Sequence, residues 1–116
     1  MSVDVLTALL SQSGIDYSTY HDPQDALDSL HQVCHADIIF VDLDMPHLNG
    51  YQVLETLQNT PETQNLPIVA YTSHTSEMTN ARNAGFHSFL GKPLVASRFP
   101  EHLSAILNNQ SVWDIR

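Results

Sequence analysis

Two carboxylates that follow a short apolar run in the middle of the chain are the first candidates for chemistry. Residues Ile38 to Val41 form this run, and a continuous apolar run is typical of a strand that is buried on both faces of a parallel sheet. Asp42 follows directly, and Asp44 comes two residues later. Open α/β sheets bind their ligands at the carboxyl ends of the strands. Asp42 is therefore either a metal ligand or nucleophile, or a capping aspartate in the loop after the strand.

Other reactive side chains favour plainer interpretations. His31 and His35 are four residues apart and could share a helix face as metal ligands, but no third ligand has matching spacing, so we favour solvated surface positions. The single cysteine, Cys34, excludes an internal disulfide bond and fits a reducing cytoplasm. Because it lies in a helical pattern, we interpret it as a small core residue and not as a reactive thiol.

Alternating helical and extended patterns predict the elements that position these residues. Apolar spacing predicts helices over 3–13, 22–33, 50–59, 76–84 and 99–107, and strands over 15–20, 38–42, 66–72 and 86–90. Gly14 and Gly85 are suited to end helices, and Asn49-Gly50 supplies turn chemistry before a helix. This order predicts one doubly wound α/β domain with a parallel sheet over 1–116, with a C-terminal tail over 107–116.

The charge balance excludes several classes of partner. The 116 residues carry a formal charge of −9 with only four lysines and arginines, so nucleic acid and anionic lipid would repel the chain. We find no apolar run of membrane-spanning length and no signal peptide, and we expect a cytoplasmic location. If the chain is a regulator, we expect its output to be a contact with another protein.

Four motifs, in order and with matching spacing, carry a resemblance to a known family. They are Asp42-x-x-Met45-Pro46-x-x-Asn49-Gly50, the run Ile68 to Ser73, Ala84-Gly85-Phe86, and Phe89-x-x-Lys92-Pro93. Together they resemble the receiver domain of bacterial two-component response regulators, over about Val3 to Leu107. The resemblance implies a flavodoxin-like fold.

The resemblance also implies roles for individual residues. Asp42 would be the phosphoacceptor, Lys92 would pair with the phosphoryl oxygens, and Thr72 would hydrogen-bond the phosphoryl group. Phe89 would be the aromatic residue that changes rotamer with it. Asp42 and Asp44 would be ligands of Mg²⁺. The alternatives are a structural ion pair for Lys92, a strand-end hydroxyl for Thr72 and a plain core position for Phe89.

One departure from the family pattern weakens the Mg²⁺ expectation. Receiver domains normally begin with a central strand that ends in an acidic pair, whereas this sequence begins where the first helix is expected. A start codon assigned too far downstream is one explanation. Without the pair, Asp42 and a backbone carbonyl near Asp44 offer few oxygen ligands for Mg²⁺, which must offset the charge during phosphoryl transfer.

A sheet without this strand would leave backbone groups unpaired, and three repairs are conceivable. The strand over 15–20 could close against the strand that ends in Asp42. The tail around Val112 to Ile115 could fill the slot and bring in Asp114. Two chains could pair or exchange elements, which is the repair that we favour and which predicts a homodimer.

Two functions follow from these patterns. The first is a stand-alone receiver-like signalling domain that a histidine kinase or phosphotransfer protein phosphorylates on Asp42 and that acts on a downstream protein partner. The alternative is a degenerate receiver that works without phosphorylation, as an interaction or dimerisation module. We do not expect an enzyme, because no base, oxyanion loop or Gly-rich phosphate cradle accompanies Asp42.

Overall fold

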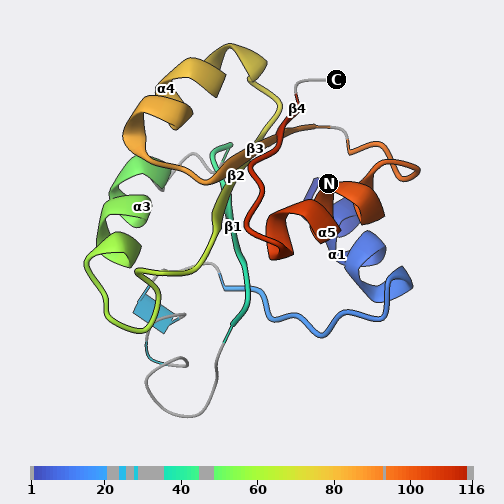
Figure 1. Ribbon diagram of the computed structural model, residues 1–116, viewed down its shortest axis with the longest axis horizontal. Helices are drawn as coiled ribbons and strands as arrows, with labels where there is room; N and C mark the ends of the chain where they lie inside the picture. The colour runs from blue at the N-terminus through green and yellow to red at the C-terminus, as the bar shows by residue number, and fades with distance from the viewer. Residues whose placement is uncertain are drawn as a thin grey trace.

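The protein is built around one parallel sheet. The computed structural model describes residues 2–20, 24–25, 28, 36–44, 49–92 and 94–114. Along the chain the elements are α1 (Ser2–Gln12), β1 (Ile39–Asp42), α3 (Gly50–Gln58), β2 (Ile68–Thr72), the 3₁₀ helix η1 (Thr75–Glu77), α4 (Met78–Ala84), β3 (Ser88–Gly91), α5 (Phe99–Leu107) and β4 (Trp113–Asp114). The four strands are parallel neighbours in the order β1-β2-β3-β4 (Figure 1). The predicted α/β fold with a parallel sheet is confirmed.

Helices cover both faces of the sheet. On one face α1 and α5 pack over Val69, Tyr71 and Leu90. On the other face α3 and α4 pack over Ile68, Ala70 and Phe89. Figure 1 shows the two helix pairs on opposite sides of the strands. All five residues of β2 are buried, which explains why this strand is a continuous apolar run in the sequence.

Two glycines and one asparagine set the ends of the helices as their residue types predict. Gly85 adopts a φ of +112° and ends α4, and Gly14 adopts a φ of +73° after α1, which are conformations that residues with a Cβ rarely adopt. At the start of α3, the side chain of Asn49 accepts hydrogen bonds from the backbone N–H groups of Tyr51 and Gln52. A Cβ on Gly50 would collide with the end of the Leu43 side chain, so any larger residue at position 50 would force that side chain to move.

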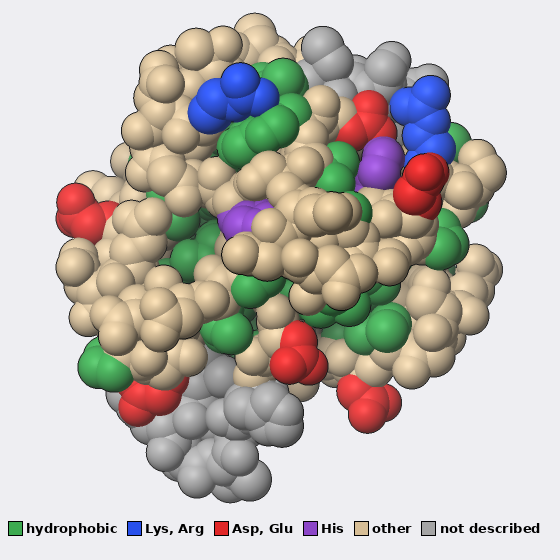
Figure 2. All heavy atoms as spheres, in the orientation of Figure 1, with side chains coloured by type: hydrophobic (Ala, Val, Ile, Leu, Met, Phe, Trp, Pro, Cys, Tyr) green, Lys and Arg blue, Asp and Glu red, His purple; other side chains and the backbone are tan. Residues whose placement is uncertain are grey.

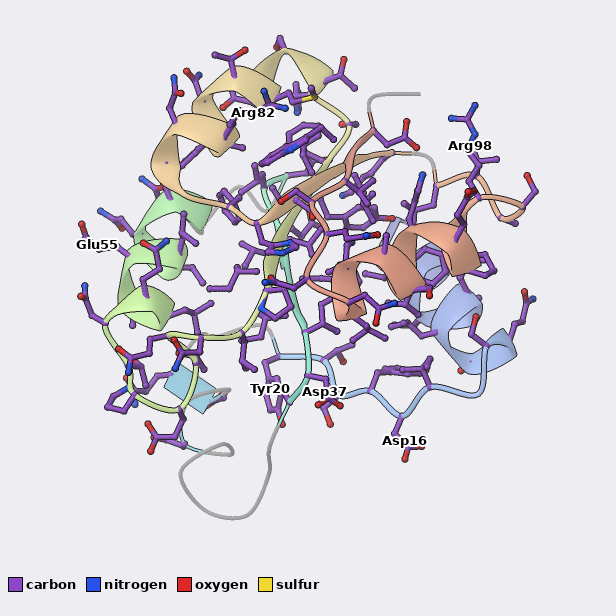
Figure 3. The ribbon with its side chains drawn as sticks, in the orientation of Figure 1. Asp16, Tyr20, Asp37, Glu55, Arg82 and Arg98 are labelled. Atoms are coloured by element: carbon purple, nitrogen blue, oxygen red, sulfur yellow. The ribbon has the colours of Figure 1, made fainter. Side chains whose placement is uncertain are left out.

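The predicted strand over 15–20 is wrong. This segment is extended but belongs to no strand, and Asp16 points away from the molecule (Figure 3). Ile15 packs against the α1–α5 side of the core, whereas Tyr17 and Tyr20 are 45% and 42% exposed. Only Ile15 of the alternating pattern packs against the core, and its backbone N–H donates to Leu10 O of α1 at 3.0 Å, so the segment is anchored to the α1–α5 side without pairing as a strand.

The C-terminal tail forms a strand, but it does not fill the slot beside Asp42. β4 pairs with β3, with Phe89 opposite Trp113 and Leu90 opposite Asp114, whereas β1 lies at the other end of the strand order. The repair that placed Asp114 near Asp42 is therefore wrong, and so is closure of 15–20 against β1. Within the described residues, β1 and β4 are the two outer strands.

Some predictions fall on residues outside the described part of the chain. These are most of the helix over 22–33, together with His31, Cys34 and His35, and the motif residues Met45, Pro46 and Pro93. Among the described helices, none has the length and apolar character needed to cross a membrane.

A pair of leucines on α5 tests the assignment of the core. Leu103 is 5% exposed and Leu107 is 47% exposed. Leu103→Ala should lower the free energy of unfolding by about 2–5 kcal/mol, because it opens a cavity under the sheet. Leu107→Ala, the matched control, should change it by less than about 1 kcal/mol. Urea unfolding followed by circular dichroism measures both, and equal losses for the two variants would contradict the packing of α5.

Candidate functional site

The candidate site lies where three neighbouring strands end. Asp42 is the last residue of β1, Thr72 is the last residue of β2, and Lys92 follows β3 directly. Because the strands are parallel, these residues meet at one edge of the sheet. Backbone hydrogen bonds of 2.9 Å join Leu43 N to Tyr71 O and Lys92 N to Thr72 O, so the first residue after β1 and the first residue after β3 are each held against β2.

Lys92 joins the two carboxylates of the site. Its Nζ lies 2.9 Å from Asp42 Oδ1 and 3.0 Å from Asp44 Oδ2. The side chain of Lys92 is only 6% exposed, and those of Asp42 and Asp44 are 16% and 20% exposed. Nζ also lies 4.6 Å from the centre of the Tyr71 ring, a distance at which a cation is attracted to the ring face. A nearly buried ammonium group therefore bridges two acidic side chains.

The carboxylate of Asp44 accepts hydrogen bonds from donors at the end of β2. Its Oδ2 accepts from both N and Oγ of Ser73 at 2.9 Å, and its Oδ1 accepts from the hydroxyl of Thr72. His74 Nδ1 is 3.0 Å from Oδ1. The backbone N–H of Asp44 in turn donates to Asp42 Oδ1 at 2.8 Å. The carboxylate of Asp44, two residues after β1 ends, thus faces the ends of β2 and β3.

These contacts change the acidity of the site. Burial by itself raises the pKa of Asp44, but the hydrogen bonds from Thr72, Ser73, Lys92 and His74 outweigh it and hold the pKa well below its usual range. Burial and the two nearby carboxylates raise the pKa of Tyr71 to about 12, so its ring stays neutral beside Lys92. Asp44 is accordingly a carboxylate at neutral pH.

The described residues do not fit a Mg²⁺ site. They contain no group of three or more His, Cys, Asp or Glu side chains that could hold a metal ion. Both oxygens of Asp44 already accept hydrogen bonds, and the ammonium group of Lys92 lies between Asp42 and Asp44. A hard divalent cation needs six or more oxygen ligands from protein and water. The prediction that Asp42 and Asp44 bind a metal therefore gains no support from the described residues.

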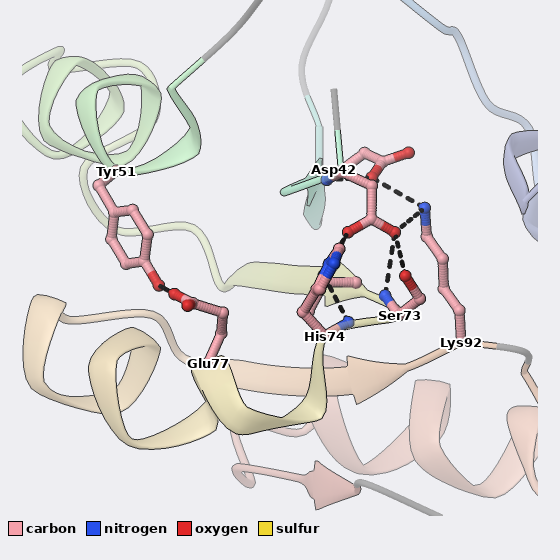
Figure 4. Close-up of polar contacts among 8 residues, drawn as sticks. Asp42, Tyr51, Ser73, His74, Glu77 and Lys92 are labelled. Atoms are coloured by element: carbon pink, nitrogen blue, oxygen red, sulfur yellow. Dashed lines mark hydrogen bonds and ion pairs between the residues drawn. The ribbon is translucent and has the colours of Figure 1, made fainter. Parts of the chain in front are cut away.

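A pocket beside the strand ends contains Leu43, Tyr51 and Glu77, which the sequence patterns did not single out. It is lined by Leu43, Asn49, Tyr51, Thr72 and Glu77, among others. The hydroxyl of Tyr51 donates to Glu77 Oε1 at 2.7 Å, which ties α3 to η1 (Figure 4). Burial and this hydrogen bond to Glu77 raise the pKa of Tyr51 to about 12. The hydrogen bond therefore holds Tyr51 and Glu77 together on one side of the pocket.

Four of the five predicted site residues come together. Asp42, Asp44, Thr72 and Lys92 form one hydrogen-bonded cluster. Phe89 is instead fully buried in β3 on the α3–α4 face of the sheet, opposite Ala70. Sequence reasoning missed the contacts of Ser73 and His74, although both directly follow a strand that ends in a candidate site residue. Their position immediately after a buried strand is the sequence signal that could have identified both residues.

A parallel α/β sheet that brings an acidic residue from the end of β1 and a lysine from the end of β3 together at one edge places this chain among the open α/β proteins, which bind their ligands at this edge. The family model described as the response regulator receiver domain matches residues 1–104. The chain belongs to this family.

Relatives and solved structures agree with this assignment. The polar-differentiation response regulator DivK of Brucella ovis is 24% identical over 111 residues, which cover 94% of this chain and 89% of DivK. The receiver domain of a sensor histidine kinase from Pseudomonas aeruginosa PAO1, solved with a magnesium ion in its active site cleft, matches with a TM-score of 0.78 and 23% identity over 92% of this chain and 88% of that domain. The chemotaxis response regulator CheY4 of Vibrio cholerae matches with a TM-score of 0.74 and 21% identity over 89% and 87% of the two chains. The fold is therefore the flavodoxin-like fold of receiver domains.

Replacement of Lys92 tests whether its two ion pairs stabilise the protein. Lys92→Met should lower the free energy of unfolding by about 3 kcal/mol, the low end for breaking a buried ion pair, because both carboxylates keep some contact with water. The control is Arg98→Met. Arg98 is 55% exposed and lies 3.6 Å from Asp114, so its loss should cost less than about 1 kcal/mol. Urea unfolding at neutral pH measures both, and a similarly small loss for Lys92→Met would show that its ion pairs do not stabilise the protein.

Proposed function

We propose that this protein is a receiver-like domain of a two-component or phosphorelay pathway and that Asp42 is its phosphoacceptor. The observation that supports the proposal best is the position of Asp42 at the end of β1, with Lys92 Nζ 2.9 Å from its Oδ1. Its carboxylate is 16% exposed, which leaves it open to a donor. Lys92 offers a positive charge to phosphoryl oxygens, and Thr72 offers a hydroxyl.

The proposed step is transfer from a phosphohistidine of a histidine kinase or phosphotransfer protein. A carboxylate oxygen of Asp42 attacks phosphorus and forms a P–O bond. The P–N bond breaks, and its electron pair leaves with the imidazole of the donor. The product is an acyl phosphate on Asp42. Catalysis of such a transfer is mainly positioning and charge stabilisation, so the chain acts as the acceptor in this exchange and not as an enzyme with its own substrate.

We propose that the output is a contact with a downstream protein, read on the surface around α4 and β3. Phe89 of β3 and Ala81 of α4 pack in the same buried cluster as Ala70 of β2, which lies two residues before Thr72. A change at Thr72 can therefore reach this surface through packed side chains. Among the described side chains visible in Figure 2, Lys and Arg lie at two separate places and form no continuous basic patch. Together with the formal charge of −9, this supports a protein partner over nucleic acid or a membrane.

A second candidate is a receiver-like interaction module that works without phosphorylation. The specific observation in its favour is that the described residues hold no group of three or more metal-binding side chains. Phosphoryl transfer to a carboxylate brings negative charges together, and a divalent cation normally offsets them. Phosphorylation of the chain in solution separates the two candidates.

Asp42→Asn should abolish phosphorylation while the fold persists, because the amide removes the nucleophile and keeps the shape of the side chain. Intact mass after incubation with acetyl phosphate, with Mg²⁺ and separately with a chelator, measures the gain of one phosphoryl group. Asp37→Asn is the matched control, since Asp37 is an exposed acidic residue just before β1. A phosphoryl group retained in Asp42→Asn would assign the acceptor to another residue. A folded wild type that gains none, also from histidine kinases or phosphotransfer proteins, would favour the second candidate.

We also propose that two chains associate through β1. Within the described residues, β1 is an outer strand that pairs only with β2, and a strand edge is a template for pairing with another chain. A symmetric contact between two copies would cover this edge on both. Light scattering should therefore give the mass of two 12.9 kDa chains at micromolar concentration. The mass of one chain across this concentration range would contradict a homodimer.

A further inference from the structure

The carboxylate of Asp44 lies among the groups that a phosphoryl group on Asp42 would need. Ser73 N and Oγ both donate to Oδ2 at 2.9 Å, Lys92 Nζ is 3.0 Å from the same oxygen, and Thr72 donates to Oδ1. A backbone N–H, hydroxyl groups and an ammonium group that converge on one point are the donor set that binds an oxyanion. In this protein the oxyanion is part of the chain.

We propose that Asp44 is an internal ligand of the oxyanion site formed by Thr72, Ser73 and Lys92, and that its carboxylate must leave this site before a phosphoryl group on Asp42 can use the same donors. The proposal deepens the function proposed above and rests on Asp42 as the acceptor. It makes Asp44 a competitor of phosphorylation and not a ligand that assists it.

Charge supports this competition. Among the described residues, Lys92 supplies the one ammonium group that contacts Asp42 and Asp44, so the cluster of these three side chains already carries an excess of negative charge. A phosphoryl group adds about 1.5 to 2 negative charges at neutral pH. Because the site is largely shielded from water, two anions that share Lys92 would repel each other strongly. Rotation of the Asp44 side chain towards solvent relieves this repulsion and frees the donors.

The state of Thr72 supports the same conclusion. Thr72 is fully buried, and its hydroxyl already donates to a carboxylate oxygen. Its Oγ1 also accepts from the backbone N–H of His74 at 3.0 Å, which fixes the start of the loop after β2. The resting protein thus holds Thr72 as an anion-bound residue, with Asp44 as the anion. Phosphorylation would exchange one anion for another at this site.

Inorganic phosphate is the probe that tests the proposal without phosphorylation. In ¹H–¹⁵N spectra of the wild type, the Ser73 amide should not respond to millimolar phosphate, because Asp44 fills the site. In Asp44→Ala the same amide should shift and saturate, and the response should be lost in Asp44→Ala/Lys92→Met. Asp37→Ala should behave as the wild type. Asp44→Ala leaves Asp42 and Lys92 as a matched ion pair, and if it does not fold, Asp44→Ser, whose shorter side chain carries no carboxylate, serves with the same criteria.

The second arm of the experiment compares the rates at which acetyl phosphate, with Mg²⁺ present, phosphorylates the wild type and Asp44→Ala. Removal of an internal competitor that fills the site most of the time should raise the rate on Asp42 by about tenfold or more. An equal phosphate response in the wild type and in Asp44→Ala, or none in a folded Asp44→Ala, would overturn the proposal.

The two arms separate this proposal from the assignment of Asp42. Phosphate binding to Asp44→Ala, without a phosphoryl gain in either protein, would keep the internal ligand and reject Asp42 as the acceptor. Equal rates of phosphorylation on Asp42 in both proteins, without phosphate binding to Asp44→Ala, would keep the acceptor and reject the internal ligand.

Discussion

The contact on which the site depends is the nearly buried ammonium group of Lys92 between Asp42 and Asp44. Removal of an ammonium group from water is costly unless opposite charges and hydrogen bonds replace the water. The sheet provides these partners because β1 and β3 are parallel to β2 and end at the same edge. The backbone hydrogen bond from Lys92 N to Thr72 O holds the lysine at this edge. The ion pairs of Lys92 therefore form only when Asp42, Asp44 and Lys92 keep their places at this edge, and the register of the parallel strands sets these places.

This coupling limits what the site can accept. One ammonium group faces two carboxylates, and the remaining negative charge is stabilised by the hydroxyl of Thr72 and by the N–H and hydroxyl of Ser73. The same dipoles suit any oxyanion of similar size. The donors of Thr72, Ser73 and Lys92 already bind the carboxylate of Asp44. This arrangement is stable, but it leaves these donors occupied when a further anion arrives. If Asp42 accepts a phosphoryl group as we propose, the contacts that stabilise the resting state also oppose this transfer.

Local sequence patterns correctly predicted the helices and strands that pack a continuous apolar surface into the core. The predictions were wrong or incomplete for segments whose structure depends on contacts with residues far away in the sequence. The runs that became β1 and β2 were predictable because burial on both faces requires continuous apolar residues. The segment 15–20 has the alternation of a strand, yet only Ile15 is anchored in the core. β4 is two residues long, too short for any periodicity, and it depends on a hydrogen bond from Phe89 N to Val112 O. In the site, Asp42 and Asp44 were predictable from their place after a strand. The convergence of Thr72 and Ser73 on Asp44 was not, because the sequence does not specify how the loop after β1 folds back.

The tail strand gives the two outer strands of the described sheet different environments. β4 is held by more than its pairing with β3, because Arg82 of α4 lies 4.5 Å from the centre of the Trp113 ring, and Asp114 is 3.6 Å from both Arg98 and His102 of the α5 region. Trp113 also packs against the cluster that contains Phe89. The C-terminal strand therefore forms part of the surface around α4 and β3 that we propose as the output surface. A partner that reads this surface would contact the tail as well as α4, so its recognition would depend on residues outside the 1–104 segment that the family model matches.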